Sequence, residues 1–265
     1  MPAPVIFGIL NLSPESFSDG GKYREPEAAL AHATRLSAEG ADVIDVGAAA
    51  SNARAPVLSA DQEIERLEPV LTGLIRAGAT VSIDSANPTV QRYALDRGVA
   101  FLNDVAGFSD ESLYERLAAA EAKLVVVHTL TGPRAAPRDT PPGEVTASLQ
   151  RFFDQRIDAL VKTGVSSNRL VLDPGMGLFL GSGAGPSIEA LRGLGQLRRR
   201  YGLPILVSVS RKSFLGELTG RRVAERGAAT LAAELYAIEA GADYIRTHTP
   251  AALRDALAVG RVLRG

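Results

Sequence analysis

The sequence predicts a single (β/α)8 barrel that occupies residues 1–265 as one domain. Three observations favour this fold: the chain length, the alternation of short apolar runs with helical stretches, and the spacing of those runs. The chain has 265 residues, and barrels of this class typically have about 250. Eight strand–helix units of about 33 residues fit that length. An open doubly wound sheet is the alternative, and the lack of a dinucleotide-binding fingerprint makes it the less favoured one.

Eight short runs rich in β-branched and other apolar residues are the expected strands. Several of them are apolar throughout instead of alternating with polar residues, which is typical of parallel strands covered on both faces. The runs are Val5–Leu10, Val43–Val46, Thr80–Ile83, Val99–Leu102, Lys123–Val127, Leu170–Leu172, Pro204–Val209 and Tyr244–Arg246.

Helix signals lie between these runs. Ser59 is followed three residues later by Gln62, which is a capping-box pattern. The helical stretch from Pro26 ends at Gly40, and Thr249 stands before a first-turn proline. Four polar insertions rich in proline and glycine each follow an expected strand, so we expect them to be βα loops: residues 12–25, 48–58, 131–143 and 177–186.

Composition excludes several classes of function. The 29 basic and 30 acidic residues give a net charge of -1, which argues against nucleic acid or a membrane surface as a partner. The chain has no cysteine, so disulfides, thiolate zinc sites, iron–sulfur clusters and thiol nucleophiles are excluded, and the cytoplasm is the expected location. We expect no signal peptide, because Met1-Pro2-Ala3-Pro4 contains no basic region and leads directly into an expected strand. We expect no membrane span, because no run of about 18 apolar residues is present.

Polar or ionisable residues follow nearly every expected strand. In a barrel these residues meet at one rim, the carboxyl ends of the strands, where active sites of this fold lie. Burying so many polar groups is costly unless a ligand pairs with them. The residues are Asn11, Asp45, Asp84, Asn103, Asp104, His128, Asp173, Ser208 to Lys212, Arg246 and His248.

The chemistry of this rim suggests two kinds of ligand group. Two carboxylates, an amide and an ammonium match a flat heterocycle with a guanidine-like edge and a carbonyl. On the other side of the mouth, two basic side chains and a helix start near Thr249 form a candidate anion site. The first set is Asp84, Asn103, Asp173 and Lys212, and the second set is Arg246 and His248. We therefore predict a heterocycle at the base and a phosphate at the rim.

Seven short motifs in the chain resemble those of the dihydropteroate synthases. They extend from the first expected strand to the last, so the resemblance covers almost the whole chain, and together they are highly specific. They are residues 8–21 (GILNLSPESFSDGG), 40–47 (GADVIDVG), 82–84 (SID), 103–105 (NDV), 172–177 (LDPGMG), 210–213 (SRKS) and 245–248 (IRTH).

The resemblance implies a reaction and a role for each site residue. The family condenses 6-hydroxymethyl-7,8-dihydropterin pyrophosphate with p-aminobenzoate to give 7,8-dihydropteroate and pyrophosphate. By resemblance, the pterin is held by Asp84, Asn103, Asp173 and Lys212, and the catalytic residues are Asp84, Lys212 and Arg246. The pyrophosphate is met by Asn11, Arg246 and His248, with Mg2+ near Asn11. The p-aminobenzoate side comprises Ser51, Gly177, Leu178, Phe179 and Ser210. The family is usually dimeric, and the apolar helix Ala228–Ala242 is equally consistent with a homodimer surface and with packing on the barrel.

Two segments depart from the family pattern. Where most members read Gly-Gly-Glu-Ser-Thr-Arg-Pro, this chain reads GAAASNARAP over residues 47–56, so that Ser51 replaces Thr, Asn52 replaces Arg, and Arg54 is a candidate substitute cation. Where most members read Gly-Phe-Gly-Lys, residues 177–186 form a longer segment without the lysine. These departures resemble the sulfonamide-resistant branch of the family or a close chromosomal relative of it. We expect Leu178 and Phe179 to narrow the p-aminobenzoate pocket against bulkier sulfonamides.

Structural roles compete with functional ones at several positions. We interpret Asp104, Arg211 and His128 as structural, and Arg211 as a partner of a neighbouring carboxylate. His32 is expected to face solvent, and Asp45 is equally consistent with either role.

Three other functions are alternatives to a synthase. A methyltetrahydrofolate–corrinoid methyltransferase would share the heterocycle set but would not need the pyrophosphate site. A Schiff-base aldolase using Lys212 would need an apolar pocket around that lysine. A non-catalytic pterin-binding member is favoured only by the altered segment at residues 47–56.

Overall fold

The computed structural model describes residues 3–12, 26–50 and 55–264. In this part of the chain eight parallel strands form one sheet in the order β6-β5-β4-β3-β2-β1-β8-β7. A parallel bridge between Leu172 and Ile205 joins β6 to β7 and closes the sheet into a barrel. The strands are β1 (Val5–Asn11), β2 (Val43–Gly47), β3 (Val81–Asp84), β4 (Phe101–Asp104), β5 (Lys123–Val127), β6 (Leu170–Asp173), β7 (Leu206–Val207) and β8 (Tyr244–Thr247).

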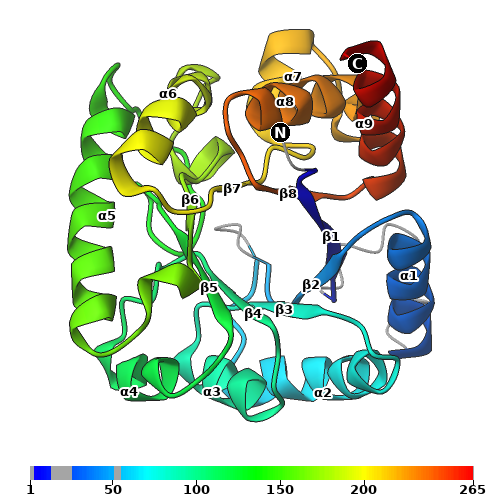
Figure 1. Cartoon of the computed structure of the whole chain (residues 1–265), viewed down its shortest axis with the longest axis vertical. Coiled ribbons are helices and arrows are strands. Elements are labelled where there is room, and N and C mark those ends of the chain that lie inside the picture. Colours follow the sequence, from blue (N-terminus) through cyan, green and yellow to red (C-terminus); the bar gives the residue numbers. More distant parts are fainter. Residues whose placement is uncertain (1–2, 13–25, 51–54, 265) are drawn as a thin grey trace.

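Helices surround the barrel, as Figure 1 shows. Each strand is followed by at least one helix, and β7 is followed by two α-helices, α7 and α8. The α-helices are α1 (Pro26–Ala38), α2 (Ala60–Arg76), α3 (Pro88–Asp96), α4 (Tyr114–Ala118), α5 (Glu144–Lys162), α6 (Gly185–Tyr201), α7 (Ser213–Thr219), α8 (Gly227–Glu239) and α9 (Pro250–Arg264). Short 3-10 turns are η2 (Glu111–Leu113), η3 (Ser167–Arg169), η4 (Gly177–Phe179) and η5 (Val223–Glu225).

The predicted fold class is confirmed. All eight expected strands are present, and the sheet closes instead of ending in two open edges. The predicted capping box of α2 is also present, because Ser59 Oγ accepts from Gln62 N and Gln62 Oε1 accepts from Ser59 N. The strand expected over Pro204–Val209 is shorter than expected, since only Leu206 and Val207 pair along β8.

Side chains on the inner face of the barrel alternate along each strand, as strand geometry requires. Near the strand starts the inner layer is apolar. Three aromatic rings there meet edge to face, with centroid distances of 4.9 Å for Phe7–Phe101, 5.7 Å for Phe7–Tyr244 and 6.1 Å for Phe101–Tyr244. Lys123 Nζ donates to the Tyr244 hydroxyl at 3.1 Å. This aromatic plug fills the end of the barrel at which the strands begin.

The next inner layer is polar. Two residues further along the same strands, the apolar positions Val43, Phe101, Val171, Leu206 and Tyr244 are replaced by Asp45, Asn103, Asp173, Ser208 and Arg246. The intervening residues, such as Ile44, Val46 and Leu172, point outward into the core between sheet and helices. A polar floor therefore lies directly on an apolar plug, at the carboxyl ends of the strands.

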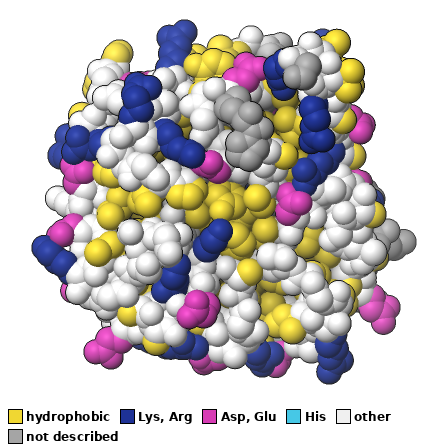
Figure 2. Space-filling model, viewed as in Figure 1, with side chains coloured by type: hydrophobic (Ala, Val, Ile, Leu, Met, Phe, Trp, Pro, Cys, Tyr) yellow, Lys and Arg dark blue, Asp and Glu magenta, His cyan; other side chains and the backbone are white. Residues whose placement is uncertain are grey.

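The molecular surface in Figure 2 carries hydrophobic side chains over the middle of the barrel and charged side chains of both signs around them. Among the described residues, no helix combines the length and the apolar character that crossing a membrane requires.

Candidate active site

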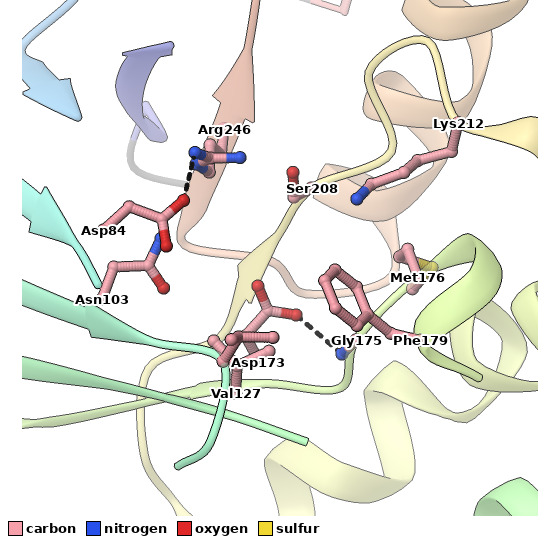
Figure 3. A pocket seen from close by; sticks show the side chains of 11 residues that line it. Asp84, Asn103, Val127, Asp173, Gly175, Met176, Phe179, Ser208, Lys212 and Arg246 are labelled. Carbon is pink, nitrogen blue, oxygen red and sulfur yellow. Dashed lines mark hydrogen bonds and ion pairs between the residues drawn. The ribbon is translucent and has the colours of Figure 1, made fainter. Parts of the chain in front are cut away.

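A pocket opens above the polar floor at the carboxyl ends of the strands (Figure 3). Carboxylate, amide and guanidinium groups lie on one side of it, and the Lys212 ammonium reaches toward its centre from the other side. The pocket is lined by Asp84, Asn103, Val105, Val127, Asp173, Gly175, Met176, Phe179, Ser208, Lys212 and Arg246. The four residues predicted to hold a heterocycle, Asp84, Asn103, Asp173 and Lys212, therefore line one pocket. Arg246, one of the two predicted anion ligands, lines the same pocket.

Arg246 is the central cation of the pocket wall. Its Nη2 donates to Asp84 Oδ2 at 2.7 Å, and its Nε donates to Asp45 Oδ2 at 2.5 Å. The Arg246 side chain is 13% exposed and that of Asp45 is fully buried. Although burial opposes a charged form, the two carboxylates raise the pKa of Arg246 above its ordinary value. The guanidinium therefore stays charged and fixed.

Asn103 lies beside this ion-pair cluster. Its Nδ2 donates to Asp45 Oδ2 at 3.4 Å, and two buried oxygen atoms, Asn103 Oδ1 and Asp45 Oδ1, have no hydrogen-bond partner among the described residues. Buried acceptors without partners are uncommon in proteins. Because Asn103 lines the pocket, its free amide oxygen is available to a donor on a bound molecule.

Asp173 is aimed into the pocket by a tight turn. Its Oδ1 accepts from Gly175 N at 2.7 Å. Gly175 has φ +73°, and a Cβ there would lie 2.2 Å from the carbonyl oxygen of His128, so only glycine fits. His128 supports the same turn, since its Nδ1 donates to Pro174 O at 3.1 Å and its Nε2 accepts from Ser148 Oγ at 2.9 Å. Burial lowers the pKa of His128 to about 4, so the ring is neutral and its interpretation as structural agrees with this geometry.

Lys212 reaches into the pocket from the side opposite the carboxylates. Its Nζ lies 5.0 Å from the centroid of the Phe179 ring, which is a cation–π distance. Burial, followed by the nearby Arg246, lowers the pKa of Lys212 to about 8, while Asp173 and Asp84 act in the opposite direction. Burial raises the pKa of Asp84 to about 6 and that of Asp173 to about 6. The pocket thus holds two carboxyls and one ammonium with pKa values close to neutral pH, a property that clusters at functional sites.

Ser210 and His248 link the ends of β7 and β8. The Ser210 hydroxyl accepts from His248 N at 3.2 Å and lies 2.9 Å from His248 Nδ1. Burial, then Arg211, Arg246 and Lys212, lower the pKa of His248 to about 3. The ring is therefore neutral, and in the tautomer in which the Ser210 hydroxyl donates to Nδ1, the single ring hydrogen lies on Nε2. In that tautomer His248 offers an N–H, but not a positive charge, to an anion.

Two sequence interpretations near this pair need correction. His32 was expected to face solvent, but it is half-buried, and burial followed by the charge of Arg35 lowers its pKa. Arg211 was expected to pair with a carboxylate; it forms no ion pair with any described acidic residue, and its backbone is left-handed with φ +59°. Neither exposure nor backbone conformation at these positions has a signal in the sequence.

Asn11 ends β1 on the rim, next to Gly47 at the end of β2. A Cβ on Gly47 would lie 3.6 Å from Asp84 Cβ and 3.7 Å from Asn11 Oδ1, so these two side chains flank the same glycine. Among residues 3–12, 26–50 and 55–264 there is no group of three or more His, Asp or Glu side chains arranged for a metal ion. Asn11 thus offers a single hard oxygen at this side of the mouth.

The segment Gly177–Phe179 is held firmly by the loop after β5. Leu130 N and Thr129 Oγ1 both donate to Phe179 O, at 2.8 and 3.1 Å, and Thr131 Oγ1 donates to Leu178 O at 3.2 Å. Gly177 N donates to the buried Ser187 Oγ at 2.9 Å. The Phe179 ring is 8% exposed and forms part of the pocket wall. Of the other residues predicted for p-aminobenzoate, Ser51 lies outside the described residues, as do Asn52 and Arg54.

Asp45 is equally consistent with a structural and a functional role from the sequence alone. In the structure it is fully buried and forms an ion pair that anchors Arg246. The two residues are 201 positions apart, so their pairing has no local signal. The period-two pattern of β2 did contain a signal, since Asp45 shares a face with the inward-facing Val43.

The fold and this pocket define an enzyme of the (β/α)8-barrel class, with its site at the carboxyl ends of the strands. Residues 7–248 match the model of a family described as pterin binding enzyme. The type-2 dihydropteroate synthase of Escherichia coli is 54% identical over 260 residues, covering 98% of this chain and 96% of the relative. The type-1 enzyme of Escherichia coli is 46% identical over 260 residues, covering 97% and 93%.

Solved structures agree with the sequence relatives. Dihydropteroate synthase from Xanthomonas albilineans with 4-aminobenzoic acid has a TM-score of 0.89 at 35% identity, covering 99% of this chain and 93% of that one. The same enzyme in complex with 7,8-dihydropteroate has a TM-score of 0.86 at 33% identity, covering 99% and 94%. The chain belongs to the dihydropteroate synthase family, which consists of transferases.

Proposed function

We propose that this site joins 6-hydroxymethyl-7,8-dihydropterin pyrophosphate to p-aminobenzoate, with the pterin seated on the polar floor. The observation that carries this assignment is the convergence of Asp84, Asn103 and Asp173 on one pocket facing Lys212. Two carboxylates and an amide oxygen suit the N–H groups of a pterin's guanidine-like edge, and the ammonium suits its carbonyl or a ring nitrogen.

The bond changes follow from this placement. The C–O bond between the pterin methylene and pyrophosphate breaks, and the aromatic amine forms the new C–N bond and then releases a proton. As pyrophosphate departs, positive charge develops on the methylene, and the Asp84 carboxylate, which lines the pocket, would stabilise it. Arg246 and the Nε2–H of His248 would stabilise the departing pyrophosphate.

Mg2+ is the proposed cofactor. The donor chemistry fits, because Asn11 presents an amide oxygen at the rim, and Mg2+ binds through few protein oxygens together with substrate phosphates. When bound there, the ion would offset charge on the leaving pyrophosphate. Asn11 would hold it from the protein side.

We further propose reduced sensitivity to sulfonamides. Phe179 is held in the pocket wall by three hydrogen bonds to backbone oxygens of η4 and by contact with Lys212. A rigid wall excludes a ligand that extends beyond the volume of p-aminobenzoate while it spares p-aminobenzoate itself. The altered segment Gly177–Phe179 would thus select against the drug.

We also infer a homodimer that uses α8, in the cytoplasm. Tyr236 on α8 is 45% exposed, and Leu218 on α7 and Val223 on η5 are more than half exposed, which is the apolar character that subunit interfaces require. Sedimentation of the purified chain tests this: Tyr236→Arg should convert a dimer to a monomer, and a wild-type monomer would contradict the inference.

The decisive experiment measures pyrophosphate release from dihydropterin pyrophosphate and p-aminobenzoate with Mg2+, with and without excess sulfamethoxazole. Release that persists in the drug supports both the synthase and the reduced sensitivity. Release that the drug abolishes keeps the synthase but removes the role given to Leu178 and Phe179. No release would indicate a pterin-binding protein that has lost its chemistry.

A further inference from the structure

The loop that carries Lys212 into the pocket has an unfavourable backbone conformation. Lys212 directly precedes α7, and the residue before it, Arg211, has φ +59°. A residue with a side chain adopts this left-handed region at a steric cost, so it persists only where neighbouring groups hold it. Such a conformation directs the chain sharply and thereby determines where the next side chain points.

The first turn of α8 provides the groups that hold this conformation. Arg226 Nη1 donates to Arg211 O at 2.9 Å and to Lys212 O at 3.2 Å. On the other side of the same residue, Arg211 N donates to Thr230 Oγ1 at 3.1 Å. The peptide groups on both sides of Arg211 are therefore fixed from α8.

Arg226 is fitted into this position. Its Nε donates to Arg221 O at 3.1 Å, so that its guanidinium serves three backbone oxygens, and it forms no ion pair with a described carboxylate. A Cβ on Gly216 of α7 would lie 2.1 Å from Arg226 Nη2. Glycine at this position thus leaves room for the guanidinium against α7.

The two ends of Lys212 consequently belong to different environments. Its backbone is held from outside the barrel by Arg226, while its ammonium lies in the pocket over the Phe179 ring and faces Asp84 and Asp173. A shift of the backbone by a fraction of an ångström would move the ammonium relative to both carboxylates.

We propose that Arg226 and Thr230 are positioning residues for Lys212: together they hold Arg211 in its left-handed conformation and thereby place the ammonium in the pterin pocket. This inference rests on the proposed contact between Lys212 and the pterin. A purely structural role for Arg226 would instead stabilise the connection between α7 and α8 without affecting any property of Lys212.

Three variants test the proposal: Arg226→Met removes the donors but keeps the length, Arg226→Lys keeps the charge, and Thr230→Val keeps the shape but loses the hydroxyl. The matched control is Arg222→Met in the same connection, whose side chain is 87% exposed and is paired with Glu225. For each variant the melting temperature, the Kd of 6-hydroxymethyl-7,8-dihydropterin, and kcat/KM for dihydropterin pyrophosphate against pH are measured.

We expect Arg226→Met to lower kcat/KM at least tenfold and Thr230→Val to lower it threefold or more, with a matching rise in the Kd of the pterin. The alkaline limb of the pH profile should move upward in both, because a displaced ammonium is better solvated. Arg226→Lys should recover part of the loss. Adding Arg211→Gly to Thr230→Val should also recover part of it, since glycine accepts the left-handed conformation without support.

The proposal is overturned if Arg226→Met and Arg222→Met give the same kcat/KM and the same alkaline limb, with only the melting temperature reduced. If Arg226→Met does not fold, Arg226→Lys and Thr230→Val decide, and an unchanged alkaline limb and pterin Kd in both would reject the proposal. A wild-type chain that neither binds the pterin nor releases pyrophosphate would instead reject the proposed function on which the inference depends.

Discussion

Arg246 Nη2 and Asp84 Oδ2 are 2.7 Å apart, so the main cation of the pocket is paired with the carboxylate that we assign to the pterin. The side chain of Asp84 is 30% exposed, whereas that of Asp45, the other partner of Arg246, is fully buried. One carboxylate therefore anchors the guanidinium, and the other is shared between Arg246 and the pocket.

Asp84→Asn should lower kcat/KM for dihydropterin pyrophosphate by about 100-fold, which corresponds to about 2.7 kcal/mol. The asparagine side chain keeps the shape of the aspartate but lacks the negative charge that we propose acts on the pterin. It also removes one of the two charged partners of Arg246. Steady-state kinetics measure this. Asp158→Asn, at an exposed position paired with Lys162, is the matched control and should behave as wild type; an equal effect of the two changes would contradict the role of Asp84.

The pH profile of kcat/KM should be bell-shaped. Asp84 and Asp173 carry a negative charge, and accept hydrogen bonds at both oxygens without also donating, only when ionised, so activity should rise as pH passes their pKa values of about 6. Lys212 donates fully only when protonated, so activity should fall as pH passes its pKa of about 8. Lys212→Arg should abolish the alkaline limb, because guanidinium stays protonated there, and an alkaline limb that persists would assign it to another group.

Ser210→Ala should weaken inhibition by the product pyrophosphate about threefold to tenfold, the worth of one hydrogen bond of about 1 kcal/mol. Without the hydroxyl, His248 loses the hydrogen-bond partner of both its Nδ1 and its backbone N, so the orientation of the ring that we assign to the pyrophosphate is no longer held. Inhibition kinetics with pyrophosphate measure this. A rise confined to the KM of p-aminobenzoate would instead restore the role predicted from the sequence, in which Ser210 lies on the p-aminobenzoate side.

Gly175→Ala should destabilise the protein by about 3 kcal/mol or more, because it adds a backbone clash with His128 O to the left-handed cost. Gly78→Ala is a matched control: Gly78 has a similar φ of +71°, but no atom of the described residues lies within 4 Å of its added Cβ. That change should cost only about 1–2 kcal/mol. Denaturant unfolding compares the two, and equal losses would show that the clash is relieved by movement of the turn.

Phe179→Gly, or deletion of Phe179, should increase inhibition by sulfamethoxazole at least tenfold while the KM of p-aminobenzoate changes much less. The ring occupies the pocket wall that we expect the drug to cross. Phe179→Leu retains bulk and is the control, which should remain resistant. If inhibition by sulfamethoxazole is unchanged after the ring is removed, residues other than Phe179 discriminate between the drug and p-aminobenzoate.

The sequence was sufficient to predict the architecture because each strand is a short apolar run followed by a polar residue. It also predicted the four pocket groups that the structure brings together, Asp84, Asn103, Asp173 and Lys212. In a closed parallel barrel all strand ends meet at one rim, so residues far apart in sequence become neighbours without any pairing information.

Interactions between rim residues could not be predicted in this way. The hydrogen bond of Ser210 with His248 and the contact of Arg226 with Arg211 O depend on exact backbone paths in loops. Likewise, β7 is short because the chain leaves the sheet after Val207 and then turns at Ser210 and the left-handed Arg211, where Lys212 N donates to Val209 O. Apolar periodicity does not report such turns.

The edge-to-face rings of Phe7, Phe101 and Tyr244 block the end of the barrel opposite the pocket. We therefore infer that both proposed substrates and both products pass through the opening at the carboxyl ends of the strands. With the pterin on the polar floor, this predicts that the pterin binds before p-aminobenzoate and that dihydropteroate leaves with its benzoate end first. In this proposal the order of binding and release follows from three aromatic side chains that are not part of the pocket lining.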